Sequence, residues 1–164
     1  METGSYSADL IEVRVAGIFK TRHTFFTSSQ ELGTLLIKGG RSCGMFQGAD
    51  SEKYQIEQPS IWKKYYQIRE ENEVLGTAKP PGFFSRNFMI DMEDSLFELP
   101  PVKFWSNQYY LKDAAGQIMS DIQSRGTFKR GALVSIYQPI SLPLLVLTYF
   151  LVTKNWQEHN AAAA

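Results

Sequence analysis

Short hydrophobic runs alternate with polar, turn-forming segments along most of the chain. In the first run, Leu10–Val15, hydrophobic and polar residues follow one another with a period close to two, which is typical of a half-buried strand. Later runs are rich in Val, Ile, Phe and Tyr and are bounded by Gly, Pro, Asn, Asp and Ser, so they predict strands joined by turns. The predicted hairpins pair Phe25–Thr27 with Leu35–Ile37, Tyr65–Ile68 with Val74–Leu75, Phe88–Ile90 with Leu96–Leu99, and Tyr109–Leu111 with Ile118–Met119, and Leu133–Tyr137 is the last predicted strand.

The hairpins recur at nearly regular intervals. Thr27, Ile68 and Leu111 occupy comparable places in three of them, at steps of 41 and 43 residues. A glycine followed within two residues by an aromatic comes after each, at Gly44, Gly82 and Gly126. Spacing of this kind predicts repeated four-stranded units of about 40 residues.

The end of the chain breaks this pattern and predicts a helix. Ser141 is a suitable N-cap, and Pro143 fits the first turn, where a missing N–H costs nothing. The run Leu144–Val152 has no polar stripe, since only Thr148 interrupts it. A helix that is apolar on all sides must be buried on all sides. Because one sheet covers only one side, we predict a closed antiparallel barrel threaded by this helix.

The predicted organisation is one mainly β domain over residues 10–157, with the central helix at about 141–156. Tails are expected at 1–9 and 158–164, with Ala161–Ala164 frayed. The apolar run Ile140–Val152 is shorter than the roughly 20 residues that a spanning helix needs, so a buried core helix is favoured over a membrane anchor.

Composition narrows the class of protein. The chain has 164 residues, with 17 Lys and Arg against 17 Asp and Glu. It therefore lacks the basic excess of a nucleic-acid-binding domain, and no nucleic acid partner is expected. The single Cys43 excludes a disulfide framework and fits a reducing compartment, and two histidines do not suffice for a typical zinc site. The first nine residues show no signal peptide pattern.

Three segments carry a resemblance to a known family: Trp62–Gly76, Tyr109–Ile118 and Leu142–Leu151. With the hairpin pattern, they make the chain from about Leu10 to Trp156 similar to the tubby C-terminal-like superfamily. That group includes tubby domains, phospholipid scramblases and LURP-one-related proteins, and this chain resembles its small bacterial members. The resemblance implies a 12-stranded barrel around a central helix and contact with lipid head groups. The chain lacks the cysteine cluster of the scramblases, and no phosphoinositide-contacting residue of tubby can be matched to it.

Basic residues near predicted strand ends are the candidate binding groups. On a barrel they could converge into a site for an anionic head group, and the alternative is a solvated exterior balanced by the acids. The candidates are Lys20, Arg22, Lys63, Lys64, Arg125, Lys129 and Arg130, with His23 beside the first two.

Other polar groups favour structural roles. The acidic turn Asp91–Asp94 lacks the spacing of a calcium loop, and Lys38–Gly44 lacks that of a phosphate-binding loop. His23 and Cys43 lie in different hairpins without a nucleophile signature. The aromatics could form a stacking platform for bases or sugars, but packing is favoured for them, with alternate members facing the barrel interior and the rest covering its rim. They are Phe83, Phe84, Phe104, Trp105, Tyr109 and Tyr110.

We therefore expect a non-enzymatic binding or scaffold module without catalytic residues, metal or cofactor. The leading expectation is a cytoplasmic protein that engages anionic phospholipid at the inner membrane surface. The alternative is a protein-interaction or regulatory module with no lipid role. A small-molecule binder using the barrel mouth is a third possibility, although the helix should already fill the lumen.

Overall fold

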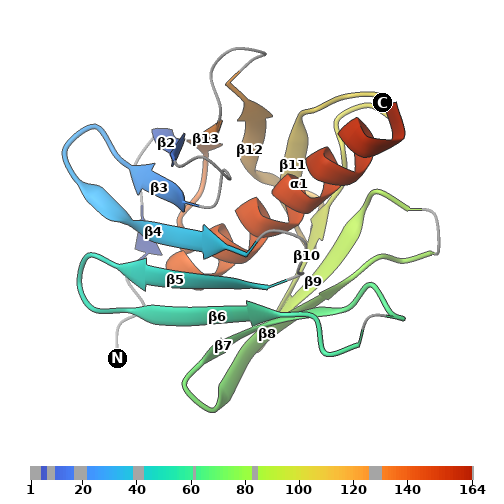
Figure 1. Cartoon of the computed structure of the whole chain (residues 1–164). Helices are drawn as coiled ribbons and strands as arrows, with labels where there is room; N and C mark the ends of the chain where they lie inside the picture. Colours follow the sequence, from blue (N-terminus) through green and yellow to red (C-terminus); the bar gives the residue numbers. More distant parts are fainter. Residues whose placement is uncertain are drawn as a thin grey trace.

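Twelve strands form a closed antiparallel barrel around one helix (Figure 1). The computed structural model describes residues 5–6, 10–16, 22–38, 43–60, 62–82, 85–125 and 131–163. The barrel order is β10-β11-β12-β13-β2-β3-β4-β5-β6-β7-β8-β9, with β9 paired back to β10. The strands are β2 (Leu10–Ala16), β3 (Arg22–Phe26), β4 (Glu31–Ile37), β5 (Gly44–Gly48), β6 (Lys53–Glu57), β7 (Tyr66–Glu70), β8 (Glu73–Lys79), β9 (Phe88–Met92), β10 (Ser95–Leu99), β11 (Tyr109–Asp113), β12 (Ile118–Ser124) and β13 (Gly131–Ile136). The predicted fold class is confirmed.

The helix α1 (Leu142–Ala163) passes through the barrel, and every residue from Leu142 to Thr153 is buried. Its first turn is capped as predicted, because the Ser141 hydroxyl accepts a hydrogen bond from the backbone N–H of Leu144. Each large side chain buried here contributes about 1.5–3 kcal/mol to stability. The helix therefore forms the centre of the hydrophobic core, and the prediction that it has no wet side is confirmed.

Aromatic rings of the barrel wall pack edge-on against the helix. Phe25 lies 5.1 Å from the ring of Tyr149, and Tyr66 lies 5.7 Å from that of Phe150, between centroids. His23 also points inward, is buried, and hydrogen-bonds the Tyr149 hydroxyl through Nδ1. Its expected place in a surface basic cluster is therefore wrong, because the alternation of β3 turns its side chain to the inner face.

The predicted four-stranded units are confirmed by three matching irregularities. The hairpins β3/β4, β7/β8 and β11/β12 each join a five-residue strand to a seven-residue strand. In each hairpin the register shifts within the first strand, after Phe25, Ile68 or Leu111, so that one residue of the second strand has no partner. The predicted landmarks Ile68 and Leu111 are therefore equivalent, but Thr27 is not, because it lies in the turn after β3. The extra residues are Leu32, Leu75 and Met119. Such bulges increase strand twist and help a sheet to close.

The glycine landmarks of the sequence do not mark equivalent places in these units. Gly44 begins β5, Gly82 lies in the connection after β8, and Gly126 falls outside the described residues. Gly44 and Gly82 therefore do not mark a structural repeat, whereas the three bulges do.

Two elements lie where the sequence predicts none. The hairpin β5/β6 has strands that carry polar residues and terminal glycines, which weaken the strand pattern. Before the barrel, β1 (Ser5–Tyr6) pairs with β14 (Ile140–Ser141), so the expected N-terminal tail contains a short strand. The helix also extends beyond the predicted residue 156 to Ala163, in keeping with the high helix propensity of alanine. In the part of the chain that the structure describes, α1 does not meet the length and apolarity that a membrane-crossing helix requires.

Replacing Leu147, which is fully buried on the helix, tests this core. Leu147→Asp removes a buried apolar side chain and places a carboxyl group without partners in the barrel. The penalty of roughly 2–7 kcal/mol for the unpaired polar group, added to the lost burial, is comparable with the total stability of about 5–15 kcal/mol of a domain. We expect loss of the cooperative thermal transition by circular dichroism. The matched control is Gln157→Glu on the exposed end of the same helix, which should melt like the wild type. A folded Leu147→Asp variant with unchanged melting would place the helix elsewhere.

Candidate functional site

The two ends of the barrel are built differently. At the end where α1 finishes, the strands are joined by segments of five to nine residues: 17–21, 38–43, 58–65, 80–87, 100–108 and 125–130. At the opposite end, the barrel strands are joined by turns of two to four residues, at 27–30, 49–52, 71–72, 93–94 and 114–117, and 137–139 leads to β14. We call these the long-loop end and the short-turn end. In Figure 1 the turns of β3/β4 and β5/β6 lie on the left, and the helix ends at the upper right.

Charge separates between these two ends although the chain is neutral overall. Among their described residues, the long connections carry six basic residues and no acid: Lys38, Lys63, Lys64, Arg86, Lys103 and Arg125. The short-turn segments carry five acids and no basic residue: Asp50, Glu52, Glu71, Glu93 and Asp94. The rest of the long-connection sequence also holds no Asp or Glu. The barrel therefore has a basic end and an acidic end, which whole-chain net charge conceals.

Four of the predicted basic residues lie in the described part of the chain, and all four are at the long-loop end. Lys63 is exposed, and Lys64 pairs with Glu158 of the helix at 2.6 Å. Arg22 begins β3, and Arg125 follows β12, where it pairs with Glu12 at 2.8 Å. The structure thus brings them to one rim, but β4 and β5 separate Arg22 from the two lysines. The other candidates, Lys20, Lys129 and Arg130, lie outside the described residues.

A groove of about 870 Å³ opens between the β6/β7 and β8/β9 connections. Three lysines line it without any carboxylate among the lining residues, and Trp62 and Tyr65 add aromatic surface. Lys63 and Lys64 were predicted as site residues, whereas Lys79 at the end of β8 was missed. Its position 16 residues beyond Lys63 carries no local motif, and only barrel closure brings it alongside. The groove's full lining is Gln58, Trp62, Lys63, Lys64, Tyr65, Lys79, Pro80 and Gly82.

Arg86 organises the neighbouring connection, residues 100–108. Its guanidinium donates hydrogen bonds to the carbonyl oxygens of Phe104 and Ser106 and to the Tyr109 hydroxyl. Burial raises the pKa of Tyr109, so its phenol stays neutral beside this cation. The helix holds the same region, because Asn155 donates to the Arg86 carbonyl at 2.8 Å. Arg86 is thus a structural anchor of the basic end, which its isolated place in the sequence did not reveal.

The described aromatic residues at this end include both exposed and buried side chains, and the sequence did not predict which would be exposed. Phe104 and Trp105 are 82% and 73% exposed, so the expected alternation, which would turn one of these two neighbours inward, is wrong for them. Tyr109 is buried as expected and Tyr110 is half-buried, whereas Phe83 and Phe84 lie outside the described residues. The connection 100–108 folds on itself rather than continuing a strand, which turns Phe104 and Trp105 outward.

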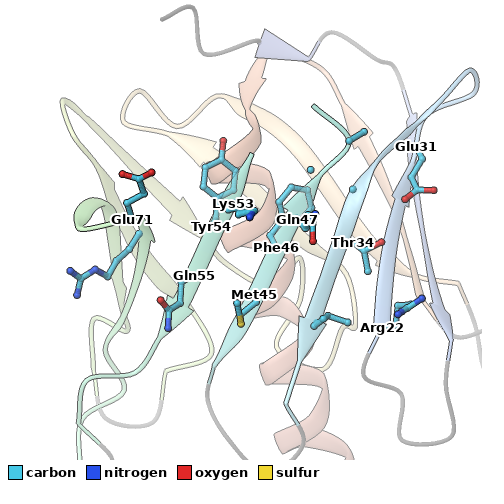
Figure 2. Close-up of a pocket in the computed structure, with 15 residues that line it drawn as sticks. Arg22, Glu31, Thr34, Met45, Phe46, Gln47, Lys53, Tyr54, Gln55 and Glu71 are labelled. Carbon is cyan, nitrogen blue, oxygen red and sulfur yellow. The ribbon is translucent and has the colours of Figure 1, made fainter. Parts of the chain in front are cut away.

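A second groove, of about 660 Å³, crosses the outer face of β3 to β7 (Figure 2). Its floor includes one row of cross-strand neighbours, in the order Arg22, Leu36, Met45, Gln55 and Arg69. Leu36 and Met45 are 43% and 54% exposed, and both acids and bases line the rest of the groove. Arg69 already pairs with Glu57 at 3.2 Å. This face therefore combines an apolar centre with mixed charge, unlike the basic end.

The remaining candidate groups have structural surroundings. Glu93 lies in the two-residue turn between β9 and β10 with a φ of 48°, which is the backbone of a tight hairpin turn. Gly44 begins a strand, so the Lys38–Gly44 stretch does not open a helix. In the described ranges, no three His, Cys, Asp or Glu side chains gather as a metal ion would require.

No family model matches the chain, and no curated protein matches its sequence. Its structure is similar to the X-ray structure of a protein from Arabidopsis thaliana, AT5G01750, with a TM-score of 0.66. The two chains are 8% identical, and the similarity covers 93% of this chain and 95% of the other. This likeness shows the fold: the protein belongs to the structural class of barrels closed around a C-terminal helix.

The anchoring role of Arg86 can be measured. In Arg86→Met the carbonyl groups of the 100–108 connection lose their charged donor, so the connection should open more often. We expect the amide hydrogens of Val102, Ser106 and Gln108 to exchange about tenfold faster or more, since a hydrogen bond to a charged group contributes roughly 1.5–3 kcal/mol.

Arg69→Met is the matched control, because Arg69 is also half-buried and also donates to a backbone carbonyl, that of Asn72, but lies near the short-turn end. It should leave those three amides unchanged. Equal exchange in Arg86→Met and the wild type would show that the connection holds its shape without Arg86.

Proposed function

We propose that this protein is a non-enzymatic binding module that attaches through its long-loop end to anionic phospholipid at the inner, cytoplasmic surface of a membrane. The observation that carries the proposal is the separation of charge along the barrel axis. Each lysine or arginine near an anionic membrane surface contributes about 1 kcal/mol to attachment. Several basic residues on one rim therefore suffice for reversible binding, even though the whole chain is neutral.

The charge separation also sets the orientation of the attached protein. An anionic surface attracts the basic rim and repels the acidic turns, which face the opposite way along the barrel. Only one end of the molecule therefore approaches the lipid. A neutral protein with intermixed charges would have no such preference, because attraction and repulsion would cancel within a Debye length of about 8–10 Å.

The groove beside Trp62 is the proposed place for a head-group phosphate. Its lysines present ammonium groups that bind phosphate oxygens, and its lining residues include no carboxylate. Lys64 must leave Glu158 to take part. That exchange costs little, because both side chains of the pair are partly exposed, and such surface pairs contribute about 0–1 kcal/mol.

The resemblance to tubby C-terminal-like domains supports the same proposal, since contact with lipid head groups is what it implies. We assign the protein to that superfamily as part of the proposal. The shared barrel-and-helix fold agrees with the assignment.

A protein-interaction role is the second candidate, and the outer groove favours it. Leu36 and Met45 are adjacent across β4 and β5 and form an exposed apolar centre between Arg22 and Arg69. Apolar centres with polar rims are common in protein interfaces. Of the basic residues at the long-loop end, Arg22 lines this groove but the lysines beside Trp62 do not, so a partner here would leave those lysines open.

Charge reversal at the basic end tests the lipid proposal. We expect Lys63→Glu combined with Lys79→Glu to weaken binding to vesicles of phosphatidylcholine with about 30 mol% phosphatidylserine by about 30-fold or more. Co-sedimentation at about 0.05 M salt measures this, and the wild type should lose affinity as salt rises to about 0.5 M.

Lys53→Glu combined with Lys112→Glu is the matched control, because it changes net charge equally at the other end of the barrel. That variant should bind vesicles like the wild type. Equal weakening by both double variants would reject a basic-end site, and equal binding of the wild type to neutral and anionic vesicles would reject the lipid proposal.

A photo-crosslinking residue at Met45 tests the protein-interaction candidate. We expect it to capture one partner at about 0.5 M salt, where charge attraction alone is screened. Leu36→Glu should remove that product, and the same crosslinker at Lys103 on the basic end should not give it. A product that forms equally from both positions would show that the outer groove is not the contact surface.

A further inference from the structure

Three aromatic side chains protrude into solvent at the long-loop end. Trp62, Phe104 and Trp105 are 87%, 82% and 73% exposed, whereas the other large hydrophobic residues described as exposed reach at most 59%. Trp62 comes from the connection between β6 and β7, and the other two come from that between β10 and β11. These connections flank the β8/β9 connection on the same rim. The largest exposed apolar groups and the basic residues therefore share one end of the molecule.

The tip that carries Phe104 and Trp105 is ordered in advance. Within it, the Val102 N–H donates to the Gln108 carbonyl at 2.8 Å, and the Ser106 N–H donates to the Lys103 carbonyl at 2.9 Å. The Gln108 N–H donates to the Ser106 hydroxyl at 3.0 Å. A connection that is already folded around its own hydrogen bonds needs little further ordering when it meets a partner.

Side chains from outside the connection satisfy its carbonyl groups. Arg86 donates to the carbonyl oxygens of Phe104 and Ser106, and the indole N–H of Trp156 donates to that of Asn107 at 2.9 Å. In Figure 1 the red end of the helix, which carries Trp156, lies beside this connection. Backbone carbonyls without partners are costly in an apolar medium. Because Arg86 and Trp156 already donate hydrogen bonds to these three carbonyls, the connection can place its aromatic rings in an apolar medium without exposing those carbonyls unpaired.

Both connections that carry the protruding aromatics also place a lysine next to one of them. Lys63 follows Trp62, and Lys103 precedes Phe104. Aromatic rings prefer the level between head groups and acyl chains, and lysine keeps its ammonium group among the phosphates. A protein partner would be an alternative occupant, but strand connections that carry basic residues and no acid, with Glu158 of the helix already paired to Lys64, complement an anionic bilayer over a wide area.

We infer that Trp105 and Phe104, together with Trp62 of the β6/β7 connection, insert into the boundary between head groups and acyl chains of an anionic membrane, and that Arg86 holds the 100–108 connection in the inserting shape. This rests on the proposed lipid-binding function and adds a second, apolar contribution to attachment. Two weak contributions together give firmer membrane attachment than either alone. The attached protein should accordingly keep part of its binding when salt screens the lysines.

Tryptophan fluorescence can locate the insertion, since the chain has three tryptophans, at 62, 105 and 156. The reporter variant Trp62→Phe keeps Trp105, and the control variant Trp62→Phe with Trp105→Phe keeps only Trp156 behind the tip. Vesicles contain phosphatidylserine and phosphatidylcholine brominated near the top of the acyl chains. We expect a blue shift and strong quenching in the reporter variant, and neither in the control variant.

A second pair of variants separates the two contributions. Phe104→Ser with Trp105→Ser should weaken binding about tenfold or more and remove the fraction that persists at high salt. Lys63→Glu with Lys79→Glu should instead remove the salt-sensitive part. Both pairs change exposed side chains, so thermal melting should stay that of the wild type.

The outcomes distinguish the inference from the function on which it rests. Binding to anionic vesicles without quenching of Trp105 would overturn insertion and leave lipid attachment standing. Quenching by neutral and anionic vesicles alike would support insertion and overturn the anionic requirement. Absence of vesicle binding at low salt would overturn both.

Discussion

The structure depends on one constraint: a helix without a polar side must be enclosed. Every residue from Leu142 to Thr153 is buried, and no single sheet can cover all sides of such a helix. The strands therefore close into a barrel, in which β9 meets β10 and no free edge remains. Because the helix fills the lumen, the inner surface is committed to packing, and His23 is bound there by Tyr149. Binding functions are left to the rims and the outer wall.

Closure around a helix also arranges the chain so that connections of two kinds alternate. Each up-and-down pair of strands places a tight turn at one end and a longer connection at the other. Basic and aromatic residues that are far apart in the sequence thereby meet on one rim, and acids collect on the other. The same helix that closes the core also supports that rim, since Asn155 and Trp156 hold the connections around it. The packing of the helix in the core therefore also fixes the position of the connections that form the candidate site.

The internal repeat shows how local pairing supports closure. Leu32, Leu75 and Met119 are unpaired in register at equivalent places in three units, each followed by a small residue: Gly33, Gly76 and Ser120. At Gly33 a side chain would collide with the Phe46 ring and the Gln47 carbonyl, so a small residue is required there. Three evenly spaced bulges distribute the strand twist around the barrel. The sequence shows this arrangement as hairpins that recur at steps of about 40 residues.

Local chemistry in the sequence was sufficient for the apolar helix, its Ser141 cap, the main hairpins and the closed β architecture, because periodicity, capping and turn propensity act over a few residues. It also identified Lys63 and Lys64 as candidates. It could not indicate that Lys79 lines the same groove, that Arg86 holds the connection carrying Phe104, or that Phe104 and Trp105 face solvent. Those facts arise from contacts between segments that only barrel closure brings together. The polarity of the barrel was hidden for the same reason: net charge sums over the chain, whereas the strand topology decides at which end each charge lies.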